Sequence, residues 1–171
     1  MKKISKLDIF AKLSKEDYKF SIFDHKPIHT VEESQKLRGK IEGAHTKNLF
    51  LKNKKNNFFL FSCEENTIVY LKKLKKALNL GNISFAGNSY LKDLMGVNPG
   101  SVTPFGLIND CENKIIFFLD KKILNYSKVN FHPLVNTSTV CIDTKDFLLF
   151  IKNNNKLVNI FNFDNYRLEN E

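Results

Sequence analysis

Residues 47–62 have the sequence KNLFLKNKKNNFFLFS. Two mainly apolar runs, residues 48–51 and 58–62, flank a segment over residues 52–57 that consists only of lysine and asparagine. Short apolar runs on either side of a polar turn are typical of a β-hairpin. We therefore expect two neighbouring strands here, joined by a turn over residues 52–57.

Helix-like and strand-like segments alternate on both sides of this hairpin. Apolar residues at helical spacing predict helices over residues 5–19, 69–80, 89–95 and 143–152. A hydroxyl at Thr30 and a carboxylate at Glu33 form a capping-box pattern, which predicts a short helix ending near Gly39. Strands are predicted over residues 20–23, 83–85, 105–108, 115–119 and 139–142, with 105–108 and 115–119 as a pair. The polar end, residues 162–171, is expected to be a frayed tail.

Interleaved strands and helices with a hairpin indicate an α+β fold around a mixed sheet. The 171 residues fit a single domain over residues 1–171, with its core at about residues 5–160. Hydrophobic residues make up 42% of the chain and charged residues 26%, as in soluble globular domains. No apolar run is long enough for a transmembrane helix, and the first residues lack an apolar signal core. We expect a cytoplasmic protein without a membrane partner.

The charge balance favours a polyanionic partner. The net charge is +9 and the isoelectric point about 9.4. The excess comes almost wholly from lysine, because Arg38 and Arg167 are the only arginines. Basic charge alone does not separate nucleic acid from other anions.

Cysteine and histidine spacing gives no sign of a metal or disulfide framework. Cys63, Cys111 and Cys141 are widely spaced and odd in number, so we expect three free thiols. His25 and His29 have the spacing of a helical metal pair, but Pro27 between them is incompatible with a helix interior. No metal and no cofactor are predicted.

Three stretches combine residue types that structure alone does not require: residues 45–51, 96–107 and 131–139. The first has Lys47 and Asn48 at the start of an apolar strand. The second has two prolines, three glycines and two hydroxyl side chains in twelve residues, and backbone N–H groups of such a rigid loop can point at a ligand. The third combines His132 and Asn136 with several hydroxyl groups.

At these stretches the chain resembles the prolyl-tRNA editing family, also called the YbaK/ProRS-associated domain. It looks most like the freestanding Ala-tRNA(Pro) deacylases of the ProX or PrdX type. The matching residues include the segments 47–51, 96–107 with Asn109 and Asp110, and 131–134 with Asn136, and the N-terminal pattern at 25–33. The resemblance runs from about residue 5 to about residue 160. It implies a mixed, partly barrel-like sheet flanked by helices.

The resemblance also implies a function and a site. The function is hydrolysis of the ester of mischarged tRNA(Pro), with alanine as the expected cargo, and the partners are the tRNA acceptor end and, as an open question, prolyl-tRNA synthetase. The resemblance implies two catalytic residues. Lys47 positions the tRNA end, and the backbone of Gly100 faces the ester. The substrate-binding residues that it indicates are His25, Thr30, Asn48, Ser101, Thr103, Pro104, His132 and Asn136.

The chemistry of an aminoacyl ester is consistent with these residues. The ester is already activated, so its hydrolysis depends on positioning and oxyanion stabilisation more than on a strong nucleophile. Backbone N–H groups of the Gly100 loop can stabilise the oxyanion, and the 2′-hydroxyl of the terminal ribose can orient the water. We therefore predict a substrate-assisted attack by water without an acyl-enzyme on Ser101, Thr103 or a cysteine.

Two alternatives stay open at this point. One is a deacylase for Cys- or Ser-charged tRNA, because a methyl-sized difference is worth only about 1–3 kcal/mol in a pocket. The other is a non-catalytic module of the same fold that binds tRNA or a synthetase. In either case Lys52, Lys54 and Lys55 in the hairpin turn, and the lysine-rich helix predicted over residues 69–80, are weaker candidates for holding tRNA phosphates.

Overall fold

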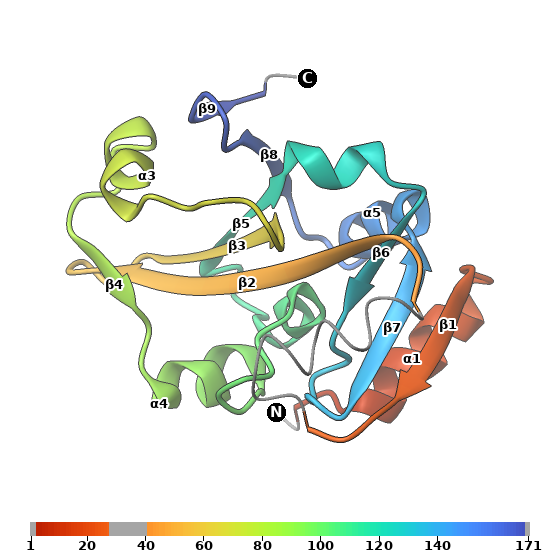
Figure 1. Cartoon of the computed structure of the whole chain (residues 1–171). Helices are drawn as coiled ribbons and strands as arrows, with labels where there is room; N and C mark the ends of the chain where they lie inside the picture. The colour runs from red at the N-terminus through yellow and green to blue at the C-terminus, as the bar shows by residue number, and fades with distance from the viewer. Residues whose placement is uncertain (1–2, 28–40, 170–171) are drawn as a thin grey trace.

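The computed structural model describes residues 3–27 and 41–169. These residues form one mixed sheet with helices on its faces (Figure 1), which confirms the predicted α+β class. The strands are β1 (Phe20–Asp24), β2 (Ala44–Asn53), β3 (Phe58–Glu64), β4 (Ile83–Phe85), β5 (Ile115–Asp120), β6 (Lys128–Phe131), β7 (Ser138–Asp143), β8 (Val158–Asn162) and β9 (Arg167–Leu168). Their order is β1-β7-β6-β2-β3-β5-β8-β9, with β4 beside β2. β1 and β9 end this order, so the sheet does not close into a barrel.

The predicted hairpin lies in the middle of this sheet. β2 and β3 are antiparallel, with Lys47 opposite Cys63 and Leu51 opposite Phe59. On one side of the hairpin, β3 pairs in parallel with β5, and β5 pairs in parallel with β8. On the other side, the first residues of β2 pair in parallel with β6. β6, β7 and β1 are joined by antiparallel pairs. β2 is therefore the strand that connects the two halves of the sheet.

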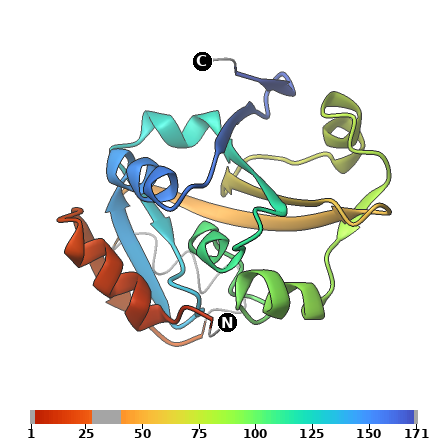
Figure 2. The ribbon, with the colours of Figure 1, turned by 180° about the vertical axis from the view of Figure 1, so that it is seen from behind.

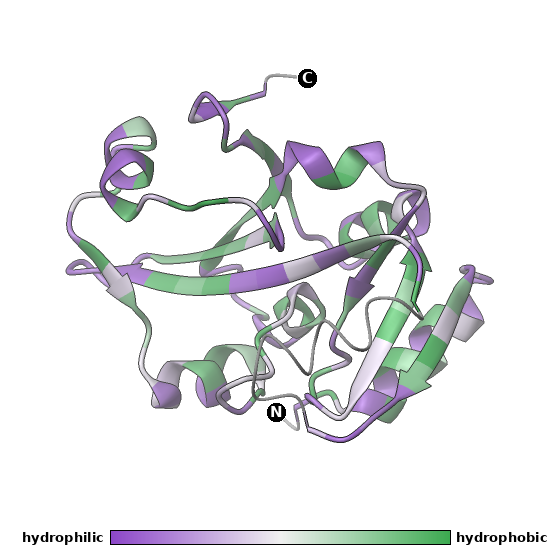
Figure 3. Cartoon of the chain, viewed as in Figure 1, coloured by the Kyte–Doolittle hydropathy of each residue, from purple (hydrophilic) through white to green (hydrophobic). Residues whose placement is uncertain are grey.

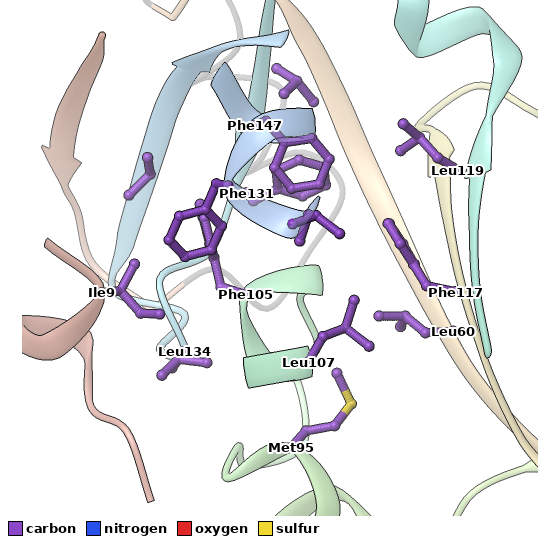
Figure 4. Packing of buried hydrophobic residues seen from close by; sticks show 14 of the residues in the cluster. Ile9, Leu60, Met95, Phe105, Leu107, Phe117, Leu119, Phe131, Leu134 and Phe147 are labelled. Atoms are coloured by element: carbon purple, nitrogen blue, oxygen red, sulfur yellow. The ribbon is translucent and has the colours of Figure 1, made fainter. Parts of the chain in front are cut away.

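One face of the sheet is covered by most of the helices. These are α1 (Lys6–Lys15), α4 (Asn88–Tyr90), the π-helix η1 (Leu91–Met95), the 3₁₀ helix η2 (Pro104–Asn109) and α5 (Thr144–Asn153). Figure 2 shows them in front of the strands. The larger core cluster fills the space between, where Phe105, Phe131 and Phe147 pack edge to face or tilted, beside Ile9 and Leu134 (Figure 4).

The opposite face carries a second, smaller core cluster under α3 (Leu71–Ala77). Alternation along the strands divides the residues between the two faces. In β2, Phe50 belongs to the larger cluster and Leu51 to the smaller one. Leu74 is the buried residue of α3, and its lysines lie on the outer side, so the amphipathic helix predicted there is confirmed in shorter form. We call this second face the α3 face.

Two local predictions are wrong. Residues 105–108 are not a strand but part of η2, because the Thr103 hydroxyl caps the helix start and Pro104 occupies its first turn. The polar end is not a frayed tail throughout, because Phe163 is buried and β9 pairs with β8. The helix predicted from Thr30 lies outside the described residues.

A further short segment, the 3₁₀ helix η3 (Lys121–Asn125), connects β5 to β6. Its N-cap is Asp120, the last residue of β5, whose carboxylate accepts a hydrogen bond from the Lys122 backbone N–H at 3.0 Å. This cap fixes the Asp120 side chain at the end of β5, which matters for the site.

Candidate functional site

Two histidines meet where β1 and β6 end and β7 begins. The ring centroids of His25 and His132 are 6.2 Å apart. His25 Nδ1 lies 2.9 Å from the Lys26 carbonyl oxygen, and His25 Nε2 lies 3.0 Å from the Thr139 hydroxyl. Because a carbonyl oxygen only accepts, Nδ1 carries the proton, and in the neutral ring Nε2 accepts from Thr139. The backbone N–H of His25 also donates to the Thr137 carbonyl at 2.9 Å, which holds the histidine against β7.

The ring of His132 is fixed in one tautomer. Its Nδ1 lies 2.9 Å from the Ser138 carbonyl oxygen, so Nδ1 donates and Nε2 keeps its lone pair in the neutral ring. Burial is the largest effect on the pKa of His132 and lowers it below 6.5. The hydrogen bond to the Ser138 carbonyl raises this pKa and nearby His25 lowers it, but each of these effects is smaller than that of burial. His132 is therefore neutral at pH 7, and its Nε2 is a hydrogen-bond acceptor.

The loop with Gly100 comes close to the turn between β6 and β7. Gly100 is exposed and has φ +83°, in the left-handed region that favours glycine. A Cβ atom on Gly100 would lie 3.7 Å from Asn136 Nδ2, so the glycine faces that side chain across ordinary contact distance. The structure thus brings Gly100 and Asn136 together, next to the segment that holds His132.

Ser101, Thr103 and Pro104, which were predicted to bind substrate, are buried. Ser101 is 4% exposed, its backbone N–H donates to the Asn98 carbonyl at 3.1 Å, and Thr103 is fully buried at the start of η2. Pro104 is buried in the first turn of the same helix. These residues hold the loop and η2 in place, whereas Gly100 is the exposed point of the loop.

Lys47 is on β2, and its amine is positioned by residues distant in sequence. Nζ donates to the Thr67 carbonyl oxygen. The Thr67 hydroxyl in turn donates to Asp120 Oδ2 at 2.7 Å, and the Glu64 backbone N–H donates to the same oxygen at 3.2 Å. Asp120 and Thr67 are 0% and 3% exposed. A buried carboxylate thus anchors the loop after β3, and that loop sets where the Lys47 amine lies.

Lys47 and His132 follow the paired residues of two neighbouring strands, β2 and β6. β2 and β6 pair in parallel, with His45 opposite Asn130, so two residues further along each chain are Lys47 and His132. The Thr46 hydroxyl donates to the Asn130 carbonyl at 2.8 Å and ties the two strands together at this point. In β2, Lys47 has the parity of Leu49 and Leu51 and not that of Phe50, so its side chain points to the α3 face, while His132 directly follows the last residue of β6.

Asn48 does not share this face. It follows Lys47 directly and has the same parity as Phe50, so it points to the opposite side of β2. There the Ser62 hydroxyl donates to Asn48 Oδ1 at 2.5 Å, across the pair Asn48↔Ser62. The described contacts of Asn48 are therefore within the sheet.

The other predicted residues lie apart from this cluster or outside the described part of the chain. Lys54 and Lys55 are exposed in the β2–β3 turn, and Lys52 donates to Asn56 Oδ1 at 2.9 Å at the far end of β2. Thr30 lies outside the described residues. Among residues 3–27 and 41–169, no group of three or more His, Cys, Asp or Glu side chains could hold a metal ion. In the same ranges no helix is long and apolar enough to cross a membrane.

The thiols are free, as predicted for all three cysteines. Cys63 lies opposite Lys47 and is fully buried. Burial raises its pKa far above the usual range, with a further increase from Asp120, although Lys47 lowers it. Burial also raises the pKa of Cys141. Both thiols are protonated near neutral pH and are poor nucleophiles.

Comparison with known proteins identifies the family. The model of the family described as "Aminoacyl-tRNA editing domain" matches residues 25–150, from the residue after β1 to within α5. The chain belongs to this family. A cattle protein (Bos taurus) named "Prolyl-tRNA synthetase associated domain-containing protein 1" is 35% identical over 148 residues, covering 84% of this chain and 86% of the relative. The prolyl-tRNA editing protein ProX of Acetoanaerobium sticklandii is 28% identical over 151 residues, covering 88% and 92%.

A solved structure supports the fold. The crystal structure of a candidate trans-editing enzyme for prolyl-tRNA synthetase superposes with a TM-score of 0.68 over 100% of both chains, at 17% identity. At this identity the likeness shows the fold alone. With the family match and the two relatives, the resemblance to prolyl-tRNA editing proteins that the sequence predicted is confirmed.

Sequence reasoning missed the residues that support the site. Thr67 and Asp120 were not predicted, although a buried aspartate at the end of an apolar strand is a signal that a polar partner is needed. Asn130 was also missed. Its Nδ2 donates to the Glu42 and Ala44 carbonyls, which hold the chain entering β2 against β6.

Proposed function

We propose that the protein is a trans-editing deacylase that hydrolyses the ester of mischarged aminoacyl-tRNA, with Ala-tRNA(Pro) as its preferred substrate. The observation that carries the proposal is that Lys47 and His132 each follow, by two residues, the parallel pair His45↔Asn130 of β2 and β6. The turn after His132 reaches the exposed Gly100. Membership of an editing family narrows the chemistry to aminoacyl-tRNA.

The proposed roles follow from charge and hydrogen-bonding capacity. A lysine ammonium has three donors, and the Thr67 carbonyl takes one, so two remain for the phosphate or ribose of the terminal adenosine. The neutral His132 can accept a hydrogen bond from the substrate at Nε2. Backbone N–H groups of the Gly100 loop are proposed to stabilise the oxyanion.

The bond that breaks is the ester between the alanyl carbonyl carbon and the ribose oxygen. A water molecule, oriented by the free ribose hydroxyl of the substrate, attacks the carbonyl carbon, and the ribose oxygen leaves with a proton. His25 and Thr30 are proposed on the amino-acid side, and Asn136 and the Ser101–Pro104 segment are proposed to shape the pocket. The proposed reaction needs no metal or cofactor. We propose that it takes place in the cytoplasm and that prolyl-tRNA synthetase is a further partner.

The test is deacylation of Ala-, Cys-, Ser- and Pro-tRNA(Pro) at equal enzyme concentration. Wild type should act fastest on Ala-tRNA(Pro), and Lys47→Ala should lose about 100-fold in rate, the scale expected when a positioning group is removed. Lys145→Ala, an exposed lysine of α5, is the matched control and should keep the wild-type rate. Circular dichroism and thermal unfolding should show that both variants fold.

Each result points to a different conclusion. Equal rates on all four substrates would remove the claim of alanine specificity. A wild-type protein that binds tRNA(Pro) but releases no amino acid would be a non-catalytic binding module. A Lys47→Ala variant as active as wild type would exclude Lys47 from the chemistry.

A further inference from the structure

The net charge of the chain is concentrated in one segment. Residues 43–92 contain nine lysines and only two carboxylates, Glu64 and Glu65, which gives +7 of the total net charge of +9. All of the cationic residues in this segment are lysines. The remainder of the chain is close to neutral, so any long-range attraction for an anion is directed to this part of the molecule.

The fold gathers most of these lysines at one end of the sheet. The β2–β3 turn and α3 lie at the same end of the molecule, away from α5 and α1, in both views (Figures 1 and 2). β4 pairs with the last residues of β2, and Asn53 Nδ2 donates to the Leu80 carbonyl at 3.1 Å, which fixes the chain after α3 beside the turn. We call the following set the basic end: Lys52, Lys54, Lys55, Lys72, Lys73, Lys75 and Lys76.

The basic end carries uncompensated charge on a hydrophilic surface. Figure 3 shows α3 and the β2–β3 turn as mainly hydrophilic, in contrast to β3 and β5. Between described residues, every ion pair involves a lysine outside the basic end. Lys54, Lys55, Lys72 and Lys76 are all exposed.

Aromatic side chains are placed among these lysines. Lys52 Nζ lies 4.8 Å from the centroid of the Tyr90 ring, and Lys73 Nζ lies 5.0 Å from that of Tyr70. Tyr70 and Phe85 are 53% and 61% exposed. Lysines with exposed aromatic rings are the composition expected of a surface that contacts a nucleic acid.

The candidate site and α3 lie on the same sheet face, whereas Lys52 has the parity of Phe50 and points to the opposite face, towards Tyr90. Leu74 of α3 packs in the smaller core cluster with Cys63, which is opposite Lys47. Lys52 lies five positions after Lys47 along β2, a span of roughly 17 Å at about 3.4 Å per residue. A nucleotide held at Lys47 cannot reach that far, whereas the duplex stem behind it can.

We propose that the basic end binds the phosphate backbone of the acceptor stem of the tRNA whose 3′ end enters the candidate site. This inference rests on the proposed function. Because lysine acts as a point charge and carries no planar fork for bidentate contacts, the basic end should attract any tRNA to a similar extent. Choice between tRNAs must then be made elsewhere.

The test measures binding of uncharged tRNA by fluorescence anisotropy over a series of salt concentrations. The variant is Lys72→Glu/Lys76→Glu, which changes two exposed residues on one side of α3 and removes no described hydrogen bond. The matched control is Lys145→Glu/Lys152→Glu on α5, which makes the same change of net charge at exposed positions away from the basic end. Uncharged tRNA(Pro) and tRNA(Ala) are both used as probes.

The basic-end variant should bind both tRNAs at least tenfold more weakly at low salt. Its plot of log K against log salt concentration should be less steep by roughly 1–2, because each phosphate contact contributes about 0.9 to the magnitude of this slope. The control should stay within about twofold of wild type. An equal loss in both variants would show that only total charge matters, and an unchanged slope would remove the basic end from the interface; either result overturns the proposal.

A second measurement separates this inference from the deacylase proposal. Hydrolysis is compared for full Ala-tRNA(Pro) and for an alanylated CCA trinucleotide, which has no stem. The basic-end variant should raise KM for the full tRNA and leave the trinucleotide rate as in wild type; a parallel loss on both substrates overturns the inference. If wild type hydrolyses neither substrate but tRNA binding still depends on the basic end, the deacylase proposal fails and the stem-binding surface stands.

Discussion

The Asp120 carboxylate is the most deeply buried part of the network that reaches Lys47. Its side chain accepts three hydrogen bonds: Oδ2 takes the Thr67 hydroxyl at 2.7 Å and the Glu64 N–H at 3.2 Å, and Oδ1 takes the Lys122 N–H at 3.0 Å. The substitution Asp120→Asn keeps the size of the side chain and replaces one of these oxygens by an NH₂ group. Its effect can be worked out bond by bond.

An amide oxygen placed at the Oδ2 position keeps two of the bonds, but as neutral ones. Each loses about 1 kcal/mol relative to a bond to a charged acceptor. The NH₂ group then faces the Lys122 N–H, and leaving that part-buried donor without a partner costs about 1–3 kcal/mol. We expect Asp120→Asn to lower the free energy of unfolding by roughly 3–5 kcal/mol, a large effect for one atom.

The measurement is urea unfolding of wild type, Asp120→Asn and a control, Asp164→Asn. Asp164 also contacts Lys122, at 2.8 Å through an ion pair, but both of those side chains are largely exposed. Such a pair contributes less than about 1 kcal/mol, so the control should unfold close to wild type. If Asp120→Asn unfolds within about 0.5 kcal/mol of wild type, the carboxylate does not hold the loop, and the argument that it positions Lys47 is wrong.

Two further predictions concern the glycines and His132. Gly100→Ala should lower the free energy of unfolding by only about 1–2 kcal/mol, the cost of left-handed backbone strain. Gly96→Ala should lower it more, because the new Cβ would be 2.7 Å from a side-chain nitrogen. Gly43→Ala should lower it most, because its Cβ would be 2.5 Å from a backbone oxygen. Equal unfolding midpoints in urea for all three would contradict this order. The lowered pKa of His132 means that the unfolded chain binds a proton more readily, so stability should fall as pH drops below about 6.5 and stay constant above it. Urea unfolding at pH 7.5 and 5.5 should show a smaller decrease for His132→Gln than for wild type, and an equal decrease would show that His132 is not the group responsible.

Much of the fold follows from local patterns in the sequence. The β2–β3 hairpin, α1, β4 and the helix after β7 depend on alternation, helical spacing and capping, all of which act between residues close in the chain. The segment 105–108 was misjudged as a strand because its apolar residues suit either structure. Thr103 and Pro104 decided in favour of a helix start.

Short strands in parallel pairs escaped the sequence analysis. β6 has four residues and β8 five, and each pairs in parallel with a strand far away in the chain, β6 with β2 and β8 with β5. A parallel pair cannot be joined by a tight turn, so no turn signal announces it. Consequently the parallel pair that brings the segments of Lys47 and His132 onto neighbouring strands could not be derived from spacing.

The sequence by itself determined the hairpin, the α+β class, the excess of lysine over acidic residues and the resemblance to an editing family, because each depends on residue types or on neighbours along the chain. Only the tertiary structure decided that Asn48 points away from Lys47, that Asp120 and Thr67 hold the Lys47 amine, and that α3 and the β2–β3 turn form one basic end. Thr67 is 20 residues from Lys47 and 53 from Asp120 in the chain. Contacts over such separations exist only when the burial of the whole core offsets the entropy of closing the loops between them.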